Sequence, residues 1–374
     1  MDMFITDIKQ QTITIDGTVY DADYCTGEML ADFRRRYGTD SFYAEVAEFL
    51  AEWFNDDDRL TVHTSGSTGA PKPLRVEKHR MMNSAMLTVD FLGLRHGDSA
   101  MLCMPLKYIA GKMVVVRSLV AGLNLLPVTP CGHPMQAIGE IPVFSAMIPM
   151  QVFNSLQTDE ERKRLMDVRH LIIGGGAIDE ALGKALKSFP HAVWSTYGMT
   201  ETLSHIALRR LNGEEASEWY TPFSNVDVRL TPDHTLAIHA PLVNPELLIT
   251  NDIVEFNARG QFRILGRKDN TVNTGGVKVQ IEQVEASLRP LLPCPFMVTS
   301  APDAKFGERI VLLVENFAPD SPAIQQAVET LPAYWRPKQT VCITRLPQTG
   351  TGKPDRATAK KIAASAPQNP IGKD

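Results

Sequence analysis

Residues 64–72 read Thr-Ser-Gly-Ser-Thr-Gly-Ala-Pro-Lys (TSGSTGAPK) and join an alternating, β-rich stretch at 59–64 to a helical pattern from Glu77 to about Leu94. Glycines let the backbone approach a ligand closely, N–H groups and hydroxyls donate to phosphate oxygens, and the lysine adds positive charge. The spacing after Gly66 is not that of a Walker A loop. The segment predicts a strand–loop–helix unit whose loop either binds phosphate or is an ordinary surface loop.

Two further clusters follow predicted strands. Gly174-Gly175-Gly176-Ala177 comes directly after the apolar run 171–173, and STYGMTET at 195–202 follows the run 192–195. Glycines at the carboxyl end of a strand fit a ligand crevice in an α/β sheet. Within the second cluster, a carboxylate among hydroxyls could hold Mg²⁺, and a tyrosine beside glycine could stack on a base. Taken alone, the glycines favour a tight connection, and Glu201 could simply cap a helix.

The C-terminal third carries two more loops of mixed character. Gly266-Arg267-Lys268-Asp269 has turn composition, and the segment 273–278 (NTGGVK) follows it closely. Near the end, LPQTGTGKPDR at 346–356 places Lys353 on a Gly/Thr loop. A lysine there is mobile and charged, which suits a catalytic role in part of a cycle, although each loop alone is an ordinary exposed loop.

The order of apolar and helical patterns predicts an α/β protein with two parts. Short apolar runs alternate with helical stretches up to about residue 195, which predicts a large layered α/β domain. From 226 to 265, short strands with turns predict a β-rich subdomain. Beyond it, the pattern predicts a small, mobile α+β domain. The predicted division is 1–266 and 267–374, with a hinge near Asp269.

Composition excludes several classes of protein. The chain has 374 residues, 44% hydrophobic and 22% charged, with a net charge of −5, so neither wholesale disorder nor nucleic acid as the main partner is expected. Five cysteines at wide spacing, without a CxxC pair, predict reduced thiols and a cytoplasmic location. No segment reads as a signal peptide or a membrane span, and the histidines lack metal-ligand spacing.

Four of these motifs occur in the order found in adenylate-forming enzymes, the superfamily of acyl- and aryl-CoA ligases, peptide-synthetase adenylation domains and luciferases. TSGSTGAPK resembles their phosphate loop, and YGMTET resembles their adenine and Mg²⁺ motif. GRKDN and GGVKVQIEQVE resemble their hinge and the start of their small domain, and LPQTGTGKPDR resembles the segment with their catalytic lysine. The resemblance covers about residues 64–356. It implies ATP, Mg²⁺ and coenzyme A as cofactors and a small carboxylic acid as substrate.

The resemblance also implies a role for each matching residue. Thr64, Ser65, Gly66, Ser67, Thr68, Gly69 and Lys72 would bind the phosphates of ATP; Gly174, Gly175, Gly176, Ala177, Tyr197 and Gly198 would border adenine; Asp252 and Arg267 would hold the ribose; and Gly275 and Gly276 would face the site in the second half-reaction. Thr200 would bind the α-phosphate, Glu201 the Mg²⁺, and Lys353 would be the catalytic lysine. The usual Thr-Gly-Asp at the ribose site is Thr250-Asn251-Asp252 here.

Residues 104–122 indicate which carboxylic acid is the substrate. This stretch resembles the acid-binding region of o-succinylbenzoate–CoA ligases of menaquinone biosynthesis, with Tyr108 in place of their histidine, and the early phosphate loop fits that short subfamily. Arg117, in an otherwise apolar helix, predicts a cation for the second carboxylate of o-succinylbenzoate, with Lys107 assisting. The alternative is that Arg117 pairs with an internal acid or reaches solvent.

Two other functions remain open at this point. One is a CoA ligase for another aryl or medium-chain carboxylic acid; a carrier-protein-loading adenylation domain is less favoured, because no carrier domain is attached. The other, from a different class, is a degenerate nucleotide-binding regulatory module. The presence of Glu201, Lys353 and the phosphate loop argues against the module, because a protein without turnover has no physical need for all three.

Overall fold

The N-terminal residues build one edge of a large sheet. The computed structural model describes residues 4–63, 73–178, 180–349 and 354–367. A hairpin forms from β1 (Ile13–Ile15) and β2 (Thr18–Tyr20), with Asp16 and Gly17 at positive φ in its turn. Helices α1 (Ala22–Gly27), α2 (Met29–Tyr37) and α3 (Phe42–Phe54) follow, and the Ser41 hydroxyl accepts a hydrogen bond from the Ala44 N–H at the start of α3.

The large sheet has the strand order β11-β10-β9-β8-β7-β5-β6-β1-β2. Strands β1, β6, β5, β7, β8 and β9 run parallel to one another. At the two ends of the sheet, β2 pairs antiparallel with β1, β10 pairs antiparallel with β9, and β11 pairs antiparallel with β10. Its remaining strands and their bounds are β5 (Ser99–Leu102), β6 (Asn124–Pro127), β7 (Phe144–Met147), β8 (His170–Ile173), β9 (Ala192–Gly198), β10 (His205–Arg210) and β11 (Thr221–Pro222). Strand β5 is buried throughout, as expected for a strand covered on both faces.

The direction of winding changes between β5 and β7. The chain passes from β5 through α5 (Ile109–Ala121) to β6 in one direction, and from β7 to β8 and β9 in the other. Right-handed crossovers in opposite directions place their helices on opposite faces of the sheet. The second set comprises α6 (Pro149–Ser155), α7 (Asp159–Met166) and α8 (Glu180–Leu186). A ligand crevice is expected where the direction reverses, at the carboxyl ends of the strands.

A short hairpin brackets the Ser/Gly/Thr segment. Strands β3 (Arg59–His63) and β4 (Pro73–Glu77) pair antiparallel, with His63 opposite Pro73. Helix α4 (Lys78–Leu92) starts after β4, so the sequence pattern found the helix but missed the strand before it. Because His63 and Pro73 pair, the two ends of segment 64–72 lie side by side, while the segment itself is outside the described residues.

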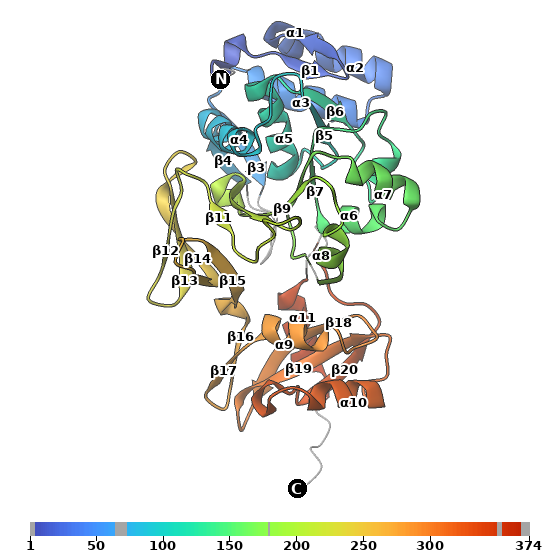
Figure 1. Ribbon diagram of the computed structural model, residues 1–374, viewed down its shortest axis with the longest axis vertical. Helices are drawn as coiled ribbons and strands as arrows, with labels where there is room; N and C mark the ends of the chain where they lie inside the picture. The colour runs from blue at the N-terminus through green and yellow to red at the C-terminus, as the bar shows by residue number, and fades with distance from the viewer. Residues whose placement is uncertain (1–3, 64–72, 179, 350–353, 368–374) are drawn as a thin grey trace.

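The β-rich subdomain forms a four-stranded antiparallel sheet beside the large sheet (Figure 1). Its strands are β12 (Asp227–Leu230), β13 (Thr235–Ala240), β14 (Asn244–Phe256) and β15 (Phe262–Arg267). The predicted turns are present, with His234 and Gly260 at positive φ. A bulge between Ile253 and Val254 shifts the β14–β15 register, and Asp252 lies opposite Arg267.

The residues after Arg267 form a separate sheet with three helices packed on it. The described strands are β16 (Thr271–Thr274), β17 (Val277–Gln280), β18 (Phe296–Asp303), β19 (Gly307–Glu315) and β20 (Gln339–Ile343); the helices are α9 (Ile281–Leu288), α10 (Pro322–Glu329) and α11 (Arg356–Ser365). They give this part the α+β composition that the sequence pattern predicts. Short 3-10 turns η1 (Ile8–Gln10), η2 (Pro134–Gln136), η3 (Thr200–Thr202), η4 (Lys268–Asn270) and η5 (Ala333–Trp335) complete the chain.

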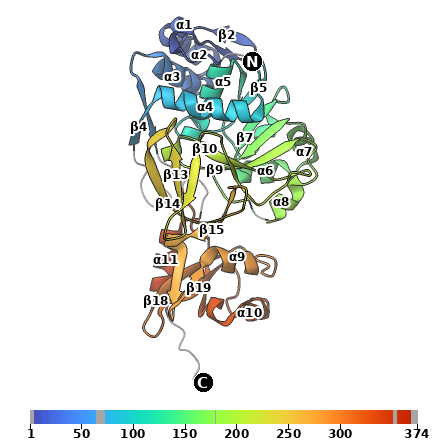
Figure 2. The ribbon, with the colours of Figure 1, turned by 60° about the vertical axis from the view of Figure 1, so that its left-hand side comes forward.

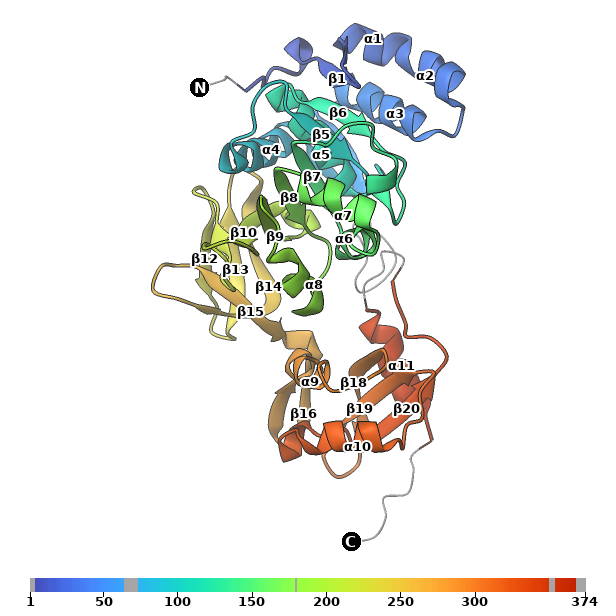
Figure 3. The ribbon, with the colours of Figure 1, turned by 45° about the vertical axis from the view of Figure 1, so that its right-hand side comes forward.

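The predicted α/β class, with its β-rich subdomain and C-terminal α+β part, is confirmed. One apolar cluster runs from the N-terminal hairpin to Phe262, and two others lie wholly within 272–363. Figure 2 and Figure 3 show the C-terminal part below the large one, joined through β15 and η4. We propose that the division predicted at 266/267 separates two domains; β15 itself extends to Arg267.

Candidate active site

Three predicted binding segments lie at the carboxyl ends of parallel strands in the large sheet. Residues 104–108 follow β5, Gly174 follows β8 and Tyr197 lies near the end of β9, while Ile148 follows β7, the strand between β5 and β8. The pairing of Ile173 with Ser195 fixes the register between β8 and β9. These segments therefore meet along one edge of the sheet, next to the point where the winding reverses.

The glycines after β8 permit this close approach. A Cβ atom on Gly174 would lie 2.4 Å from the Thr196 hydroxyl oxygen on β9, which is an impossible contact. Gly175 has a φ of +79°, and a Cβ there would lie 3.3 Å from Ile148. Gly175, Gly176 and Ala177 are exposed. The run therefore lets the end of β8 pack against its neighbours while its own backbone faces outward at the edge.

Tyr197 links the large sheet to the β-rich subdomain. Its hydroxyl donates a 2.6 Å hydrogen bond to Asp252 Oδ2, and its ring meets Phe262 edge-on with centroids 5.1 Å apart. Burial, and then the neighbouring Asp252, raise the pKa of the Tyr197 phenol, so it remains a hydrogen-bond donor at neutral pH. Tyr197, the predicted adenine-stacking residue, is therefore held by a hydrogen bond to Asp252, the predicted ribose-binding residue.

Asp252 continues this chain of contacts toward the hinge. Its Oδ1 pairs with Arg267 Nη1 at 3.0 Å, and Arg267 also contacts Asp269 through Nε at 2.9 Å and Nη2 at 3.0 Å. These hydrogen bonds from Arg267 to Asp269 raise the pKa of Arg267. Arg267 therefore joins the predicted ribose site to the predicted hinge.

Thr200 and Glu201 lie on η3, between β9 and β10. The Thr202 hydroxyl accepts from the Met199 N–H at 3.0 Å, which fixes this turn. Asn244 Nδ2 donates to the Glu201 backbone oxygen at 3.0 Å, whereas the exposed Glu201 carboxylate has no hydrogen-bond or ion-pair partner among the described residues. Mg²⁺ takes one or two carboxylates and completes its shell with water and substrate phosphates, so this single free carboxylate fits it. Within the described ranges, no group of three or more His, Cys, Asp or Glu side chains could hold a metal ion by itself.

The predicted acid-binding residues divide into two environments. Lys107 is exposed and Tyr108 is half-buried, immediately before α5. Gly111 lets their loop pack on the first turn of that helix, because a Cβ there would lie 2.6 Å from the Pro105 carbonyl oxygen. Arg117, two turns further along α5, is only 2% exposed. Its Nη2 donates to Ser204 Oγ at 2.7 Å and to Thr88 Oγ1 at 3.2 Å. Among the described residues it has no acidic partner, and it does not reach solvent.

Other predicted residues lie apart or outside the described ranges. Thr64–Lys72 and Lys353 are among the residues that the structure does not describe. Gly275 and Gly276 form the exposed β16–β17 turn at φ +61° and +85°. In Figure 1 this hairpin runs away from η4, so the structure does not bring its turn to the edge that carries Tyr197.

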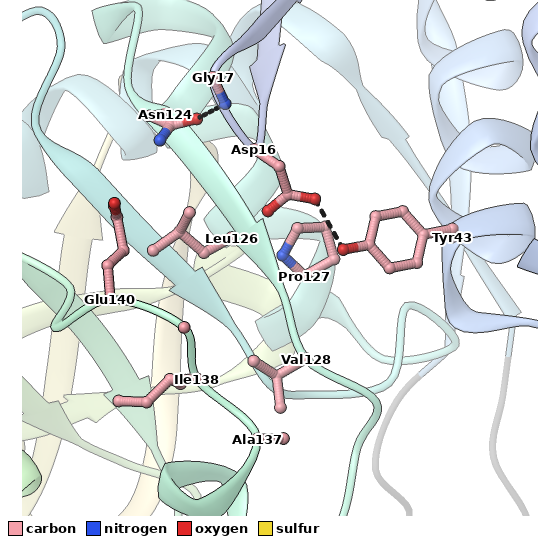
Figure 4. Close-up of a pocket in the computed structure, with 11 residues that line it drawn as sticks. Asp16, Gly17, Tyr43, Asn124, Leu126, Pro127, Val128, Ala137, Ile138 and Glu140 are labelled. Atoms are coloured by element: carbon pink, nitrogen blue, oxygen red, sulfur yellow. Dashed lines mark hydrogen bonds between the residues drawn. The ribbon is translucent and has the colours of Figure 1, made fainter.

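The sequence analysis missed Ser204, His205 and Thr88, which surround Arg117. None belongs to a recognisable pattern, although Ser204 and His205 directly follow the YGMTET motif. A pocket of about 410 Å³ also lies beside β6 and the β1–β2 turn, lined by Asp16, Tyr43, Asn124 and Glu140 among others (Figure 4). None of the predicted site residues is among those that line it.

The fold is that of an α/β protein whose loops at the carboxyl ends of neighbouring parallel strands could hold a ligand. A model of the family described as AMP-binding enzyme matches residues 9–254, so the chain belongs to that family.

Similar proteins agree with this family. A probable 2-succinylbenzoate–CoA ligase from Mycobacterium tuberculosis is 29% identical over 85% of this chain and 88% of its own length. A 2-succinylbenzoate–CoA ligase from Listeria monocytogenes is 23% identical over 88% and 77%. These relatives support an acid–thiol ligase.

Solved structures share the fold. The acyl-CoA synthetase (AMP-forming)/AMP-acid ligase II-like protein from Dyadobacter fermentans is 30% identical, with a TM-score of 0.59, over 87% of this chain and 95% of that one. The o-succinylbenzoate CoA synthetase from Bacillus subtilis, in complex with its acyl-adenylate intermediate, has a TM-score of 0.68 at 20% identity, over 83% and 70%. In the described ranges, no helix is long and apolar enough to cross a membrane.

Proposed function

We propose that this protein is an ATP-dependent acid–CoA ligase that converts o-succinylbenzoate, ATP and CoA into o-succinylbenzoyl-CoA, AMP and pyrophosphate in the cytoplasm, as a step of menaquinone biosynthesis. The observation that carries the proposal is the contiguous edge formed by Gly174–Ala177, Tyr197 and Thr200-Glu201, closed by Asp252 and Arg267. The names of the similar proteins support the acid. The free cysteines support a reducing compartment.

In the first half-reaction, a carboxylate oxygen of the acid attacks the α-phosphorus of ATP and pyrophosphate leaves. Both reactants are anionic, so the barrier is largely charge repulsion and positioning. We assign Thr200 to the α-phosphate, the ribose to Asp252 with Arg267, and the phosphates to Thr64–Lys72. Glu201 would hold Mg²⁺, which when bound offsets charge on the phosphate oxygens.

In the second half-reaction, the CoA thiolate attacks the acyl carbon of the adenylate and AMP leaves. Lys353 is needed only while pyrophosphate departs, whereas we assign the Gly275–Gly276 turn to the thiol step. The two cannot act from one arrangement if that turn points away from the site, as it does here. We therefore propose that the C-terminal part turns at Asp269 between the two steps.

The second carboxylate of o-succinylbenzoate requires a cation. Of the two that the sequence indicated, Lys107 is exposed at the active edge, while Arg117 is buried and already bound to hydroxyls. We assign Lys107, beside Tyr108, to this carboxylate. Lys107→Ala is expected to raise KM for o-succinylbenzoate roughly tenfold, the value of a lost charge-assisted hydrogen bond, and to leave KM for benzoate nearly unchanged. The exposed Lys184 on α8 provides the control, Lys184→Ala. An equal effect of Lys107→Ala on both acids would contradict this role.

The proposed reaction is tested by pyrophosphate release across a panel of aryl and medium-chain acids, with and without CoA. Release with o-succinylbenzoate and no other acid would establish the substrate. Release with a different acid instead would establish the alternative, a CoA ligase of other specificity. Binding of ATP without release for any acid would favour the regulatory module, against which the membership of an enzyme family already argues.

A further inference from the structure

Four side chains form a closed network behind the turn that carries Thr200 and Glu201. Arg117 donates to the Ser204 and Thr88 hydroxyls, and these two hydroxyls in turn contact the two ring nitrogens of His205. The contacts are Ser204 Oγ to His205 Nδ1 at 3.2 Å and Thr88 Oγ1 to His205 Nε2 at 3.1 Å. The four residues come from α4, α5, the end of the turn and the start of β10.

A neutral histidine satisfies both of its contacts in the network, while Arg117 Nε is buried and has no hydrogen-bond partner among the described residues. Both hydroxyls accept from Arg117, so each has its own proton left to donate. A neutral imidazole can accept from one hydroxyl and donate to the other. Burial and the charge of Arg117 both lower the pKa of His205, so the imidazole is neutral near pH 7. The guanidinium is thus the one cation of this network, and its described partners are hydroxyls.

The turn in front of the network needs to be held in place. Leu203, between η3 and Ser204, has a φ of +62°, which is strained for a residue with a branched side chain. Gly198, at the start of the turn, packs closely on Ser204, at its end. A Cβ atom on Gly198 would lie 2.3 Å from the Ser204 carbonyl oxygen. The turn is therefore fixed at Gly198 by close packing, while at its other end the Ser204 side chain is bound to Arg117.

We propose that Arg117 is a positioning residue for adenylation, which through Ser204 holds the 199–204 turn so that Thr200 and Glu201 face the nucleotide. The inference rests on the roles proposed above for Thr200 and Glu201. It assigns Arg117 no contact with the acid. A buried guanidinium without an acidic partner is costly, and this role gives a reason for its position that neither a substrate contact nor a plain core residue supplies.

The test compares two small changes in buried hydroxyls. Ser204→Ala removes the acceptor of the 2.7 Å bond, while Ser118→Ala removes a buried hydroxyl on α5 that donates only to the Val114 carbonyl oxygen in the described structure. Ser204→Ala is expected to slow ATP–pyrophosphate exchange about tenfold, without raising KM for the acid. Ser204→Thr keeps the hydroxyl and should restore most of the rate. Ser118→Ala should exchange at the wild-type rate.

Arg117→Met and the double variant Arg117→Met/Ser204→Ala, together with Ser204→Ala, make up a double-mutant cycle. If Arg117 acts through Ser204, the double variant is no slower than Arg117→Met alone. A rise in KM for the acid in Arg117→Met that Ser204→Ala does not share would overturn the proposal in favour of direct contact. If Arg117→Met and Ser204→Ala both lose thermal stability but keep the wild-type rate of ATP–pyrophosphate exchange, the network has only a structural role and the proposal is wrong.

MgATP affinity, measured by calorimetry without any acid, separates this inference from the proposed function. Misplacing Thr200 and Glu201 should weaken MgATP binding several-fold in Ser204→Ala, with Ser118→Ala unchanged. If the wild-type protein binds MgATP but exchanges pyrophosphate with no acid of the panel, the proposed reaction fails. The affinity comparison still decides the role of Arg117: equal affinities in the wild type and Ser204→Ala would overturn it.

Discussion

The two sides of the candidate site are held by different forces. Behind the turn at 199–204, a buried cation and neutral groups form a network in which Arg117, Thr88 and His205 are buried and Ser204 is half-buried. At the proposed hinge, Arg267, Lys268, Asp269 and Asp233 form exposed ion pairs; the Arg267 side chain is 42% accessible and that of Lys268 is 53% accessible. Exposed pairs contribute little and exchange easily, whereas buried hydrogen bonds are costly to break. The first arrangement suits a fixed surface, and the second suits a joint that moves.

The largest expected effect tests whether the joint separates two half-reactions. Lys353→Ala should slow adenylation by a hundredfold or more, because one charge that offsets the leaving pyrophosphate is lost. Thiolysis of supplied acyl-adenylate should remain nearly intact. Rapid-quench assays of each step measure both, with Lys360→Ala on α11 as the control lysine. Equal loss of both steps would refute the two-arrangement model.

A smaller effect is expected where the two regions meet. Arg267→Ala removes a partner of both Asp252 and Asp269, and should raise KM for ATP about tenfold. Its half-exposed side chain contributes little to packing, so the free energy of unfolding should change by less than about 1 kcal/mol. Chemical denaturation together with steady-state kinetics distinguishes these outcomes. A large loss of stability with unchanged KM would place Arg267 in the structural framework alone.

The pH dependence of stability tests the network behind the turn, because His205 belongs to it. The pKa of His205 lies well below its usual value in the folded state, so the unfolded chain binds more protons below about pH 6.5. The contribution of His205 to the free energy of unfolding is therefore fully present above that pH. It declines as the pH falls from about 6.5 to 5, with a slope of at most about 1.4 kcal/mol per pH unit. His205→Gln should flatten the decline. His170, whose pKa burial also lowers, contributes equally to both proteins. An identical slope in the two proteins would show that His205 is not buried as described.

The smallest effect is expected at the exposed hinge pair. Lys268 Nζ lies 2.7 Å from Asp233 Oδ2, with both side chains more than half accessible. Lys268→Ala should change the free energy of unfolding by less than about 0.5 kcal/mol, and high salt should abolish even that difference. Thermal unfolding at low and high ionic strength provides the measurement. A loss above 1 kcal/mol would mean that the hinge is held as rigidly as the buried network.

The sequence predicted local elements well and long-range partners poorly. The strand β3, the helix α4 and the strands β8 and β9 follow from an alternating pattern, a helical pattern and short apolar runs, which act over a few positions. Nothing local reveals that β1 pairs with β6, or that β17 completes a hairpin with β16. Such pairings depend on which apolar faces meet in three dimensions.

The same limit applies to the candidate site. Motifs located Gly174, Tyr197 and Glu201 at strand ends, because glycine and hydroxyl patterns have a local physical meaning. They did not reveal that Tyr197 binds Asp252, or that Thr88 and His205 surround Arg117. For Arg117, the sequence predicts a substrate carboxylate, an internal acid or solvent as the partner. Its described partners are instead two hydroxyls from distant segments, which no local pattern indicates.

Gly111 has a consequence for how this scaffold can diversify. The carbonyl oxygens of Met104 and Pro105 lie where a side chain at 111 would be, so the main chain of the 104–108 loop is fixed by its own helix. The side chains at 107 and 108 are free of that constraint. If they meet the acid as proposed, replacements there alter substrate preference without disturbing the fold. Evolution or a laboratory library can then exchange specificity at these two positions while position 111 stays invariant.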